Sequence, residues 1–156
     1  MHAETLTYRA GAPADAPVLA QLWHDMLIEA HVARAGRLVP DWRERLERDF
    51  AEQISAGTMA WFVAEAGGHI VGTAAAFLNS GRSDVLLDPT ATLAGIYTAP
   101  GYRRRGIARE VTVRAIDWCK QRGCTYVRLQ ASQAGRPLYE SLGFRTFREM
   151  MKLDLR

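Results

Sequence analysis

The sequence predicts a single α/β domain, of the α+β type, built on one mixed, mostly antiparallel central sheet with helices on both faces. Two observations lead to this prediction. Apolar strand patterns flank a Gly-Gly pair at 67–68, and a strand, a tight basic loop and an amphipathic helix follow one another over 93–123. At 156 residues the chain can enclose one core, so we expect one domain spanning residues 1–156.

The composition is ordinary for a soluble globular protein, with 48% hydrophobic and 24% charged residues. The formal net charge of +3 is carried mainly by arginine and suits an anionic ligand without implying nucleic acid. Cys119 and Cys124 match neither a disulfide framework nor a zinc pattern, so no metal site is expected. The sequence shows no signal peptide and no membrane-spanning run, and we therefore expect a cytoplasmic protein.

The first third of the chain predicts one strand and two helices. Residues Thr5 to Arg9 alternate as a strand does. Pro13 and Asp15 then open a helix with an apolar stripe, and Gly36 ends that segment. The second helix follows Pro40-Asp41 and presents a charged face to solvent, while its apolar positions recur at Trp42, Leu46, Phe50 and Ile54.

A hairpin follows these helices. Trp61 to Glu65 is a strand pattern, Gly67-Gly68 is a tight-turn signal, and His69 to Phe77 is the returning partner strand. The stretch from Asn79 to Asp84 is rich in turn-forming residues and is expected to be exposed.

The chain is organised around the stretch from Leu93 to Gly123. It begins with strand formers, is interrupted by Pro100-Gly101, and continues through three arginines and Gly106 into a helix. The apolar positions of that helix are Ile107, Val111, Ala115, Trp118 and Cys119. A glycine-containing loop leading into a helix N-terminus forms a cradle for an anion, most naturally a phosphate. The loop has neither the Gly-Lys-Ser/Thr ending of a nucleotide P-loop nor the three glycines of a dinucleotide-binding turn.

The last quarter of the chain predicts a strand, a helix and a strand. Tyr126 to Ala131 is a short strand, expected to lie parallel to the strand before the helix through a right-handed crossover. Ala134 to Leu142 is a short helix closed by Gly143. Phe144 to Leu155 is expected to return as a strand, interrupted near Arg148-Glu149.

Two motifs carry a family resemblance. The run Arg103-Arg104-Arg105-Gly106-Ile107-Ala108 resembles the acyl-CoA-binding motif of the GCN5-related N-acetyltransferases, which is Arg or Gln, two residues, Gly, one residue, then Gly or Ala. Downstream, the run from Arg136 to Phe144 contains Leu-Tyr-Glu-Ser-Leu-Gly-Phe and is similar to the last helix and turn of that family. The order of the predicted elements also agrees with the family.

The resemblance implies the cofactor site. In this family the parallel fourth and fifth strands splay apart and the pantetheine arm of acetyl-CoA lies between them. The backbone of Ile96, Tyr97 and Thr98 would then pair with the arm. The pyrophosphate would be held by the loop amides of Arg103, Arg104, Arg105, Gly106, Ile107 and Ala108.

Two more residues correspond to family positions. Tyr139 matches the tyrosine whose hydroxyl points toward the cofactor sulfur, so it is the expected catalytic acid and a cofactor contact. Ser132 stands where the family often has an asparagine that contacts the cofactor arm, and a serine has a shorter reach. Arg136 either contacts the cofactor or caps the helix.

The resemblance implies an enzyme that moves an acetyl group from acetyl-CoA directly to a primary amine of a small-molecule or amino acid-like acceptor within a ternary complex. The alternative is a non-catalytic acyl-CoA-binding module that acts as a sensor. A nucleic-acid patch at Arg103 to Arg105 is disfavoured, because the basic run is short and Glu110 and Asp117 follow it. A homodimer is common in the family, and the oligomeric state stays open.

The sequence leaves the general base and the acceptor open. The strand at 90–95 has no carboxylate, although the chemistry needs a group or a water that takes the proton of the amine. The candidates are a bound water and the side chains of His24, Glu29, His31, Asp84 and Asp88. Trp23, Trp42 and Trp61 are candidates for an apolar acceptor pocket, although buried core is the commoner place for tryptophan.

Overall fold

The structure is a computed structural model that describes residues 4–30, 37–79, 89–148 and 151–155. The first half contains strand β1 (Leu6–Ala10), the short 3-10 helix η1 (Pro13–Asp15), and helices α1 (Ala16–Glu29) and α2 (Trp42–Ala56). It continues with the strands β2 (Met59–Ala66), β3 (His69–Leu78) and β4 (Thr90–Thr98). The second half contains η2 (Pro100–Tyr102), α3 (Ile107–Gln121), β5 (Tyr126–Arg128) and α4 (Arg136–Ser141).

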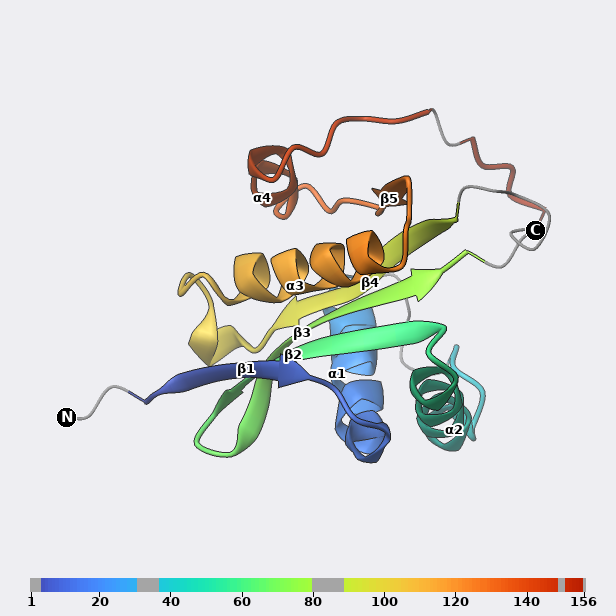
Figure 1. Cartoon of the computed structure of the whole chain (residues 1–156). Coiled ribbons are helices and arrows are strands. Elements are labelled where there is room, and N and C mark those ends of the chain that lie inside the picture. Colours follow the sequence, from blue (N-terminus) through green and yellow to red (C-terminus); the bar gives the residue numbers. More distant parts are fainter. Residues whose placement is uncertain (1–3, 31–36, 80–88, 149–150, 156) are drawn as a thin grey trace.

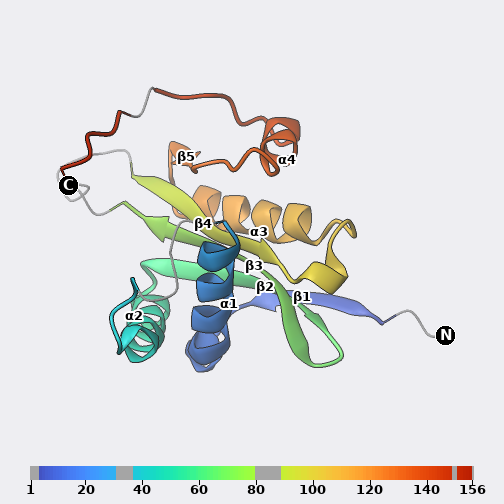
Figure 2. The same ribbon diagram turned by 180° about the vertical axis from the view of Figure 1, so that it is seen from behind.

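The strands form one five-stranded sheet in the order β1-β2-β3-β4-β5. The first three strand pairs are antiparallel, and β4 and β5 are parallel. Helix α3 lies on one face of the sheet, and α1 and α2 lie on the other (Figures 1 and 2). The predicted fold class is therefore confirmed.

Each face of the sheet has its own core, because successive side chains of a strand point to opposite faces. Toward α3, the buried residues Ile107, Val111, Ala115 and Cys119 pack against alanines and Leu93 of the sheet. Toward α1 and α2, Leu19 and Phe50 pack on Trp61 and Val63. Trp61 is only 1% exposed and belongs to this core, so it does not line an acceptor pocket.

The hairpin turn forms where the glycine pair predicts it. Gly67 and Gly68 both have positive φ angles, 55° and 81°, a combination that glycine adopts without strain. The turn joins β2 to β3 and sets their register, so the long hairpin forms the centre of the sheet.

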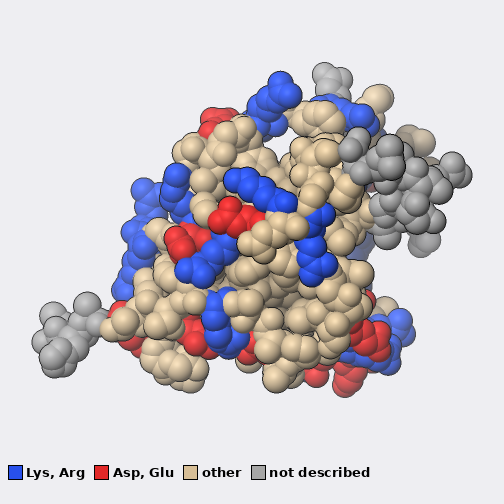
Figure 3. Space-filling view, in the orientation of Figure 1, with Lys and Arg blue, Asp and Glu red and all other residues tan. Residues whose placement is uncertain are grey.

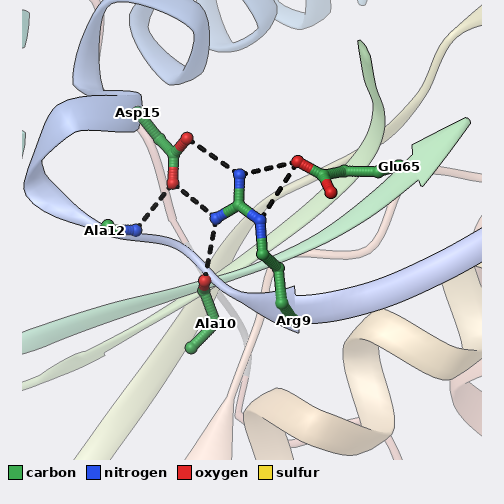
Figure 4. A network of polar contacts seen from close by, with 5 residues as sticks. All are labelled: Arg9, Ala10, Ala12, Asp15 and Glu65. Atoms are coloured by element: carbon green, nitrogen blue, oxygen red, sulfur yellow. Dashed lines mark hydrogen bonds and ion pairs between the residues drawn. The ribbon is translucent and has the colours of Figure 1, made fainter. Parts of the chain in front are cut away.

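An ion-pair network fixes the start of α1 to the sheet (Figure 4). The guanidinium of Arg9 on β1 donates to Asp15 at 2.7 and 3.0 Å and to Glu65 on β2 at 2.7 and 3.0 Å. The Asp15 carboxylate also accepts the backbone N–H of Ala12 at 2.7 Å. The guanidinium of Arg9 lowers the pKa of Asp15. The network therefore orients α1 across the face of the sheet.

The expected last strand, Phe144 to Leu155, is absent from the described part of that segment, which is 144–148 and 151–155. The prediction was wrong because alternation alone does not make a strand: a strand also needs a neighbour that accepts its backbone hydrogen bonds. Here the segment runs past β5 without pairing with it.

Smaller differences concern the ends of elements. The strand expected over Tyr126 to Ala131 ends at Arg128, and the helix expected over Ala134 to Leu142 occupies Arg136–Ser141. Several residues singled out from the sequence lie outside the described residues. They are Gly36, His31, Asp84, Asp88 and most of the turn-rich stretch from Asn79 to Asp84.

Candidate functional site

The fourth strand contains a bulge. Thr73 of β3 lies opposite Tyr97 and Ala75 lies opposite Ala94, so β4 has one residue more than β3 between these pairs. Gly95 at the bulge has a φ of +59°, and the hydroxyl of Thr73 donates to its carbonyl at 2.7 Å. A Cβ at Gly95 would lie 2.7 Å from the ring of Trp61. Only glycine fits here, and the bulge changes the direction of the strand after it.

Strand β4 extends well past its pairing with β5. The two strands pair only from Thr90–Tyr126 to Thr92–Arg128, whereas β4 continues to Thr98. The backbone groups of residues 93–98 that face away from β3 therefore have no partner strand among the described residues. The buried hydroxyl of Thr98 also lacks a hydrogen-bond partner in the described part of the chain. Unpaired backbone and hydroxyl groups of this kind fit an extended polar ligand arm.

The open part of β4 leads into the basic loop. Arg104 and Gly106 both have positive φ angles, 65° and 78°, and α3 begins at Ile107. Among the described residues no side chain caps this helix, so the first backbone N–H groups of α3 are available to an anion at the positive end of the helix dipole. Residues 103–106 are exposed, and Lys and Arg side chains gather at the left of Figure 3, over this loop.

The three arginines of the loop take different positions. Arg103 turns toward α1: its Nε donates to the carbonyl of Thr98 at 2.9 Å and its Nη2 donates to Glu29 at 2.7 Å. Arg105 lies over the ring of Tyr102, 5.2 Å from the centroid. Arg104 is exposed. The guanidinium of Arg103 therefore braces the end of β4 against α1, while Arg104 and Arg105 remain at the surface of the loop.

The side chain of Tyr97 lies on the α1 face of the sheet. The guanidinium of Arg103 lies 5.7 Å from the centroid of its ring. Burial raises the pKa of Tyr97, and the neighbouring Glu29 carboxylate adds to that increase. The Arg103 guanidinium lowers the pKa of Glu29. Tyr97, Glu29 and Arg103 thus form a polar cluster beside the open segment. No sequence pattern signals the Arg103–Glu29 pair, because the two residues are far apart in the chain.

Tyr139 is on α4 and is 9% exposed. Its ring packs edge-on against Phe144, with the ring centroids 6.0 Å apart. Burial raises the pKa of the Tyr139 hydroxyl. A hydrogen bond of 2.9 Å from Arg109 of α3 to Ser141 joins α4 to the first turn of α3. The helix that carries Tyr139 is thereby tied to the end of α3 where the basic loop enters.

Ser132 has a local contact. Its hydroxyl oxygen accepts the backbone N–H of Gly135 at 3.0 Å just before α4. A Cβ at Gly135 would lie 2.9 Å from the Tyr139 ring and 3.1 Å from the Ser132 oxygen, so these three residues pack closely. In the described part of the chain the Ser132 hydroxyl donates no hydrogen bond, and its contact with the cofactor remains a prediction. Arg136 contacts Glu140 and Thr146.

The face of the sheet covered by α1 carries the remaining candidates for proton transfer. His24 stacks on Trp42 of α2, with ring centroids 4.4 Å apart and planes 13° apart. The Nδ1 of His24 is 3.2 Å from Asp25. Trp42 and Trp23 are partly buried between α1 and α2, where Trp23 packs against Phe50. The structure thus places His24, Asp25 and Glu29 on α1, the helix that contacts β4 on the face of the sheet opposite α3.

The comparisons with known proteins agree with this geometry. The family model described as acetyltransferase (GNAT) family matches residues 21–144. The chain therefore belongs to the acetyltransferase (GNAT) family, the GCN5-related N-acetyltransferases. No helix in the described ranges is long and apolar enough to cross a membrane.

Among curated proteins, a glucosamine 6-phosphate N-acetyltransferase from Trypanosoma brucei brucei is 31% identical over 83 residues, which cover 48% of this chain and 56% of the relative. The match therefore spans a little over half of that protein's length.

Solved structures share the fold. A predicted acetyltransferase from Clostridium acetobutylicum, crystallised with acetyl-CoA, matches with a TM-score of 0.82 and 23% identity over 97% of each chain. A GCN5-related N-acetyltransferase from Ralstonia eutropha matches with a TM-score of 0.80 and 22% identity over 96% of this chain and 99% of the other.

Proposed function

We propose that this protein transfers the acetyl group of acetyl-CoA directly to a primary amine of a small-molecule or amino acid-like acceptor, within a ternary complex. The observation that carries the proposal is the open segment of β4, which leads into a positive-φ loop at the uncapped start of α3. The segment can pair with an extended arm and the loop can hold a phosphate, so the residues present fit acetyl-CoA.

Each predicted cofactor residue has a role in this proposal. The backbone of Ile96, Tyr97 and Thr98 pairs with the pantetheine arm, and one of these N–H groups polarises the thioester carbonyl. The amides of residues 103–108 hold the pyrophosphate, and the exposed Arg104 and Arg105 add positive charge nearby. Acetyl-CoA supplies the activated acetyl group, and the protein holds it beside the acceptor.

Tyr139 is the proposed acid. When the amine attacks, the bond from the acetyl carbon to sulfur breaks and the leaving thiolate needs a proton. Burial raises the pKa of the Tyr139 hydroxyl, so it is protonated at neutral pH and ready to donate. The packing against Phe144 and Gly135 fixes the ring, which limits the positions that the hydroxyl can take.

The acceptor approaches from the side of α1 in this proposal. Glu29 is ionised at neutral pH, and Arg103 lowers its pKa further, which makes Glu29 a weaker base but a suitable partner for a cationic group of the acceptor. The proton of the attacking amine is therefore assigned to a bound water or to His24, because an imidazole nitrogen can accept a proton.

Two measurements test the proposal. Calorimetric titration with acetyl-CoA is expected to give saturable one-to-one binding, with weaker binding of dephospho-CoA as the comparison. Folded protein that does not bind at millimolar ligand would overturn the cofactor assignment. A screen of primary amines that follows free CoA thiol should then give turnover, and acetyl-CoA binding without turnover on any amine would favour the sensor.

A further inference from the structure

The chain has two cysteines, Cys119 and Cys124, and both are free thiols. Their spacing in the sequence matches no disulfide framework, but the folded chain brings them together. The S–H of Cys119 donates a hydrogen bond to the sulfur of Cys124. Two thiols in contact can be joined by a disulfide, so the pair can carry chemistry that neither cysteine carries alone.

The contact is part of the turn that ends α3. The N–H of Cys124 donates to the carbonyl of Cys119 at 3.1 Å, and the N–H of Gly123 donates to the carbonyl of Lys120 at 3.0 Å. Gly123 has a φ angle of 75°, as a glycine that ends a helix in this way requires. The side chains of the first and last residues of such a turn pack together, and here both are cysteines. A disulfide needs α-carbons about 4.4–6.8 Å apart, a separation at which this hydrogen-bonded turn holds its two end residues.

The two thiols differ in their access to solvent. Cys119 is 1% exposed and belongs to the core between α3 and the sheet, whereas Cys124 is only partly buried. Burial raises the pKa of both thiols, that of Cys119 to about 12. For Cys124, the hydrogen bond from Cys119 and the charge of Arg122 oppose the increase in pKa. Cys124 is therefore the thiol that reacts first with a reagent from solvent, and Cys119 lies beside it to react second.

We propose that Cys119 and Cys124 form a reversible redox site, in which a low-molecular-mass disulfide oxidises the two thiols to an intramolecular disulfide. The site does not depend on the proposed function, because neither cysteine belongs to the proposed cofactor or acceptor residues.

With glutathione disulfide as the oxidant, two exchange steps complete the reaction. The Cys124 thiolate attacks one sulfur of the reagent. A bond from Cys124 to glutathione forms, the disulfide of the reagent breaks, and one glutathione leaves and takes up the proton that Cys124 lost. Cys119 then gives up its proton and attacks the sulfur of Cys124, which releases the second glutathione as a thiol. The protein loses two electrons and two protons, and one glutathione disulfide is reduced to two thiols.

The disulfide would fasten the end of α3 to the start of β5 (Figure 1). Thr125, the next residue, donates its N–H to the carbonyl of Pro89 at 3.0 Å, and Tyr126 then pairs with Thr90. The turn thus lies where β4 and β5 are still paired. Because the fold already holds the thiols together, the disulfide should form more readily in the folded chain than in the unfolded chain.

The mass of the intact protein tests the pair. The folded full chain is equilibrated with reduced and oxidised glutathione, free thiols are blocked with iodoacetamide, and the mass is measured. The wild-type chain should lose two hydrogen atoms and take up no iodoacetamide. Because the chain has no other cysteine, this mass identifies the intramolecular disulfide.

Two single variants separate the roles of the thiols. Cys119→Ala keeps the more accessible thiol and removes its partner, so this variant should stop at the mixed disulfide with glutathione. Cys124→Ala keeps only the buried thiol, which should react with glutathione disulfide at least about tenfold more slowly than the thiol of Cys119→Ala. Circular dichroism of each variant confirms that the fold is retained.

Repeating the wild-type equilibration in urea measures what the fold contributes, without any substitution. At a fixed glutathione mixture, the ratio of disulfide to dithiol should fall by about tenfold or more when the chain is unfolded, because the unfolded chain does not hold the two thiols in contact. By the same thermodynamic cycle, the oxidised chain should unfold at a higher urea concentration than the reduced chain.

Three outcomes would overturn the proposal. The first is a folded wild-type chain that keeps both thiols in excess oxidised glutathione. The second is a wild-type chain that stops at the mixed disulfide, as Cys119→Ala is expected to do. The third is a disulfide that forms as readily in urea as in the folded chain, since the contact in the fold would then contribute nothing to it.

Discussion

The guanidinium of Arg103 and the carboxylate of Glu29 form an ion pair at 2.7 Å that joins the basic loop to the end of α1. The same guanidinium donates to the carbonyl of Thr98. The Arg103 side chain thus contacts both the end of β4 and α1. It therefore holds the proposed phosphate loop against the helix from whose side the acceptor is proposed to approach.

Removing this pair should change stability little. Both side chains are more than a third exposed, so the attraction between them is screened by water. A double-mutant cycle with Arg103→Gln and Glu29→Gln is expected to give a coupling energy of about 1 kcal/mol or less in urea unfolding. A coupling several times larger would mean that the pair is a structural anchor.

Gly106→Ala should impair acetyl-CoA binding beyond its effect on stability. Gly106 before α3 and Gly123 after it have φ angles of 78° and 75°, and neither has an atom within 4 Å of a new Cβ. Alanine at either position should therefore lower the free energy of unfolding by a similar amount, about 1 kcal/mol.

Only Gly106→Ala should weaken the binding of acetyl-CoA that calorimetry measures, because of the two glycines only Gly106 belongs to the proposed phosphate loop. Gly123→Ala is the matched control. Equal affinity of the two variants for acetyl-CoA would argue against a phosphate site in this loop.

Tyr139→Phe should lower turnover by about 100-fold to 10,000-fold if the hydroxyl is the acid. The ring remains, so packing against Phe144 and affinity for acetyl-CoA should be nearly unchanged. Since burial raises the pKa of Tyr139, this group should not limit activity until the pH exceeds 10, the ordinary pKa of tyrosine. Steady-state kinetics over a pH series, with calorimetry alongside, checks this. Turnover of Tyr139→Phe at the wild-type rate would show that the Tyr139 hydroxyl is not the acid.

Gly95→Ala should destabilise the fold markedly. A Cβ at this position meets the buried ring of Trp61 at 2.7 Å, and the φ angle of +59° adds backbone strain. We expect a loss of roughly 2–4 kcal/mol in the free energy of unfolding, measured in urea. Gly101→Ala is the control and should be nearly neutral, because a new Cβ there has no atom within 4 Å and the φ angle is ordinary.

The ion pair at the start of α1 predicts a pH dependence. Arg9 lowers the pKa of Asp15 in the folded chain, so the pair contributes stability above the unfolded pKa, ordinarily near 3.8, and loses it as the pH falls through the lower folded value. Asp15→Asn should lower the free energy of unfolding by about 1–2 kcal/mol at pH 7. This figure allows for the partial exposure of Arg9.

The difference in free energy of unfolding between wild type and Asp15→Asn should shrink as the pH drops below the folded pKa of Asp15. Urea unfolding of both proteins at pH 7 and at acidic pH measures it. A difference that stays constant with pH would show that the variant acts through packing instead.

Much of the fold could be read from the sequence because it depends on local patterns. The Gly67-Gly68 turn, the apolar stripe of α3 and the Pro100-Gly101 pair that follows β4 each act within a few residues. The anion cradle could also be anticipated, since Gly106 and the helix after it are adjacent in the chain. The motif resemblance then led to the family that the comparisons show.

The C-terminal segment shows where local pattern fails. The alternation of Met151, Leu153 and Leu155 is a strand pattern, yet no strand pairs with it in the described part of the chain. Whether such a pattern becomes a strand depends on a neighbouring edge, which lies elsewhere in the fold or on another molecule.

The sequence by itself therefore determined the family, the central hairpin, and the strand, loop and helix that form the cradle. The tertiary structure alone decided the bulge that fits Gly95 against Trp61, the end of the β4–β5 pairing at Thr92, and the pairing of Arg103 with Glu29. The physical reason is the distance along the chain. Turns and amphipathic periods are encoded by neighbouring residues, whereas these three relationships join residues that only the packed sheet and helices bring into contact.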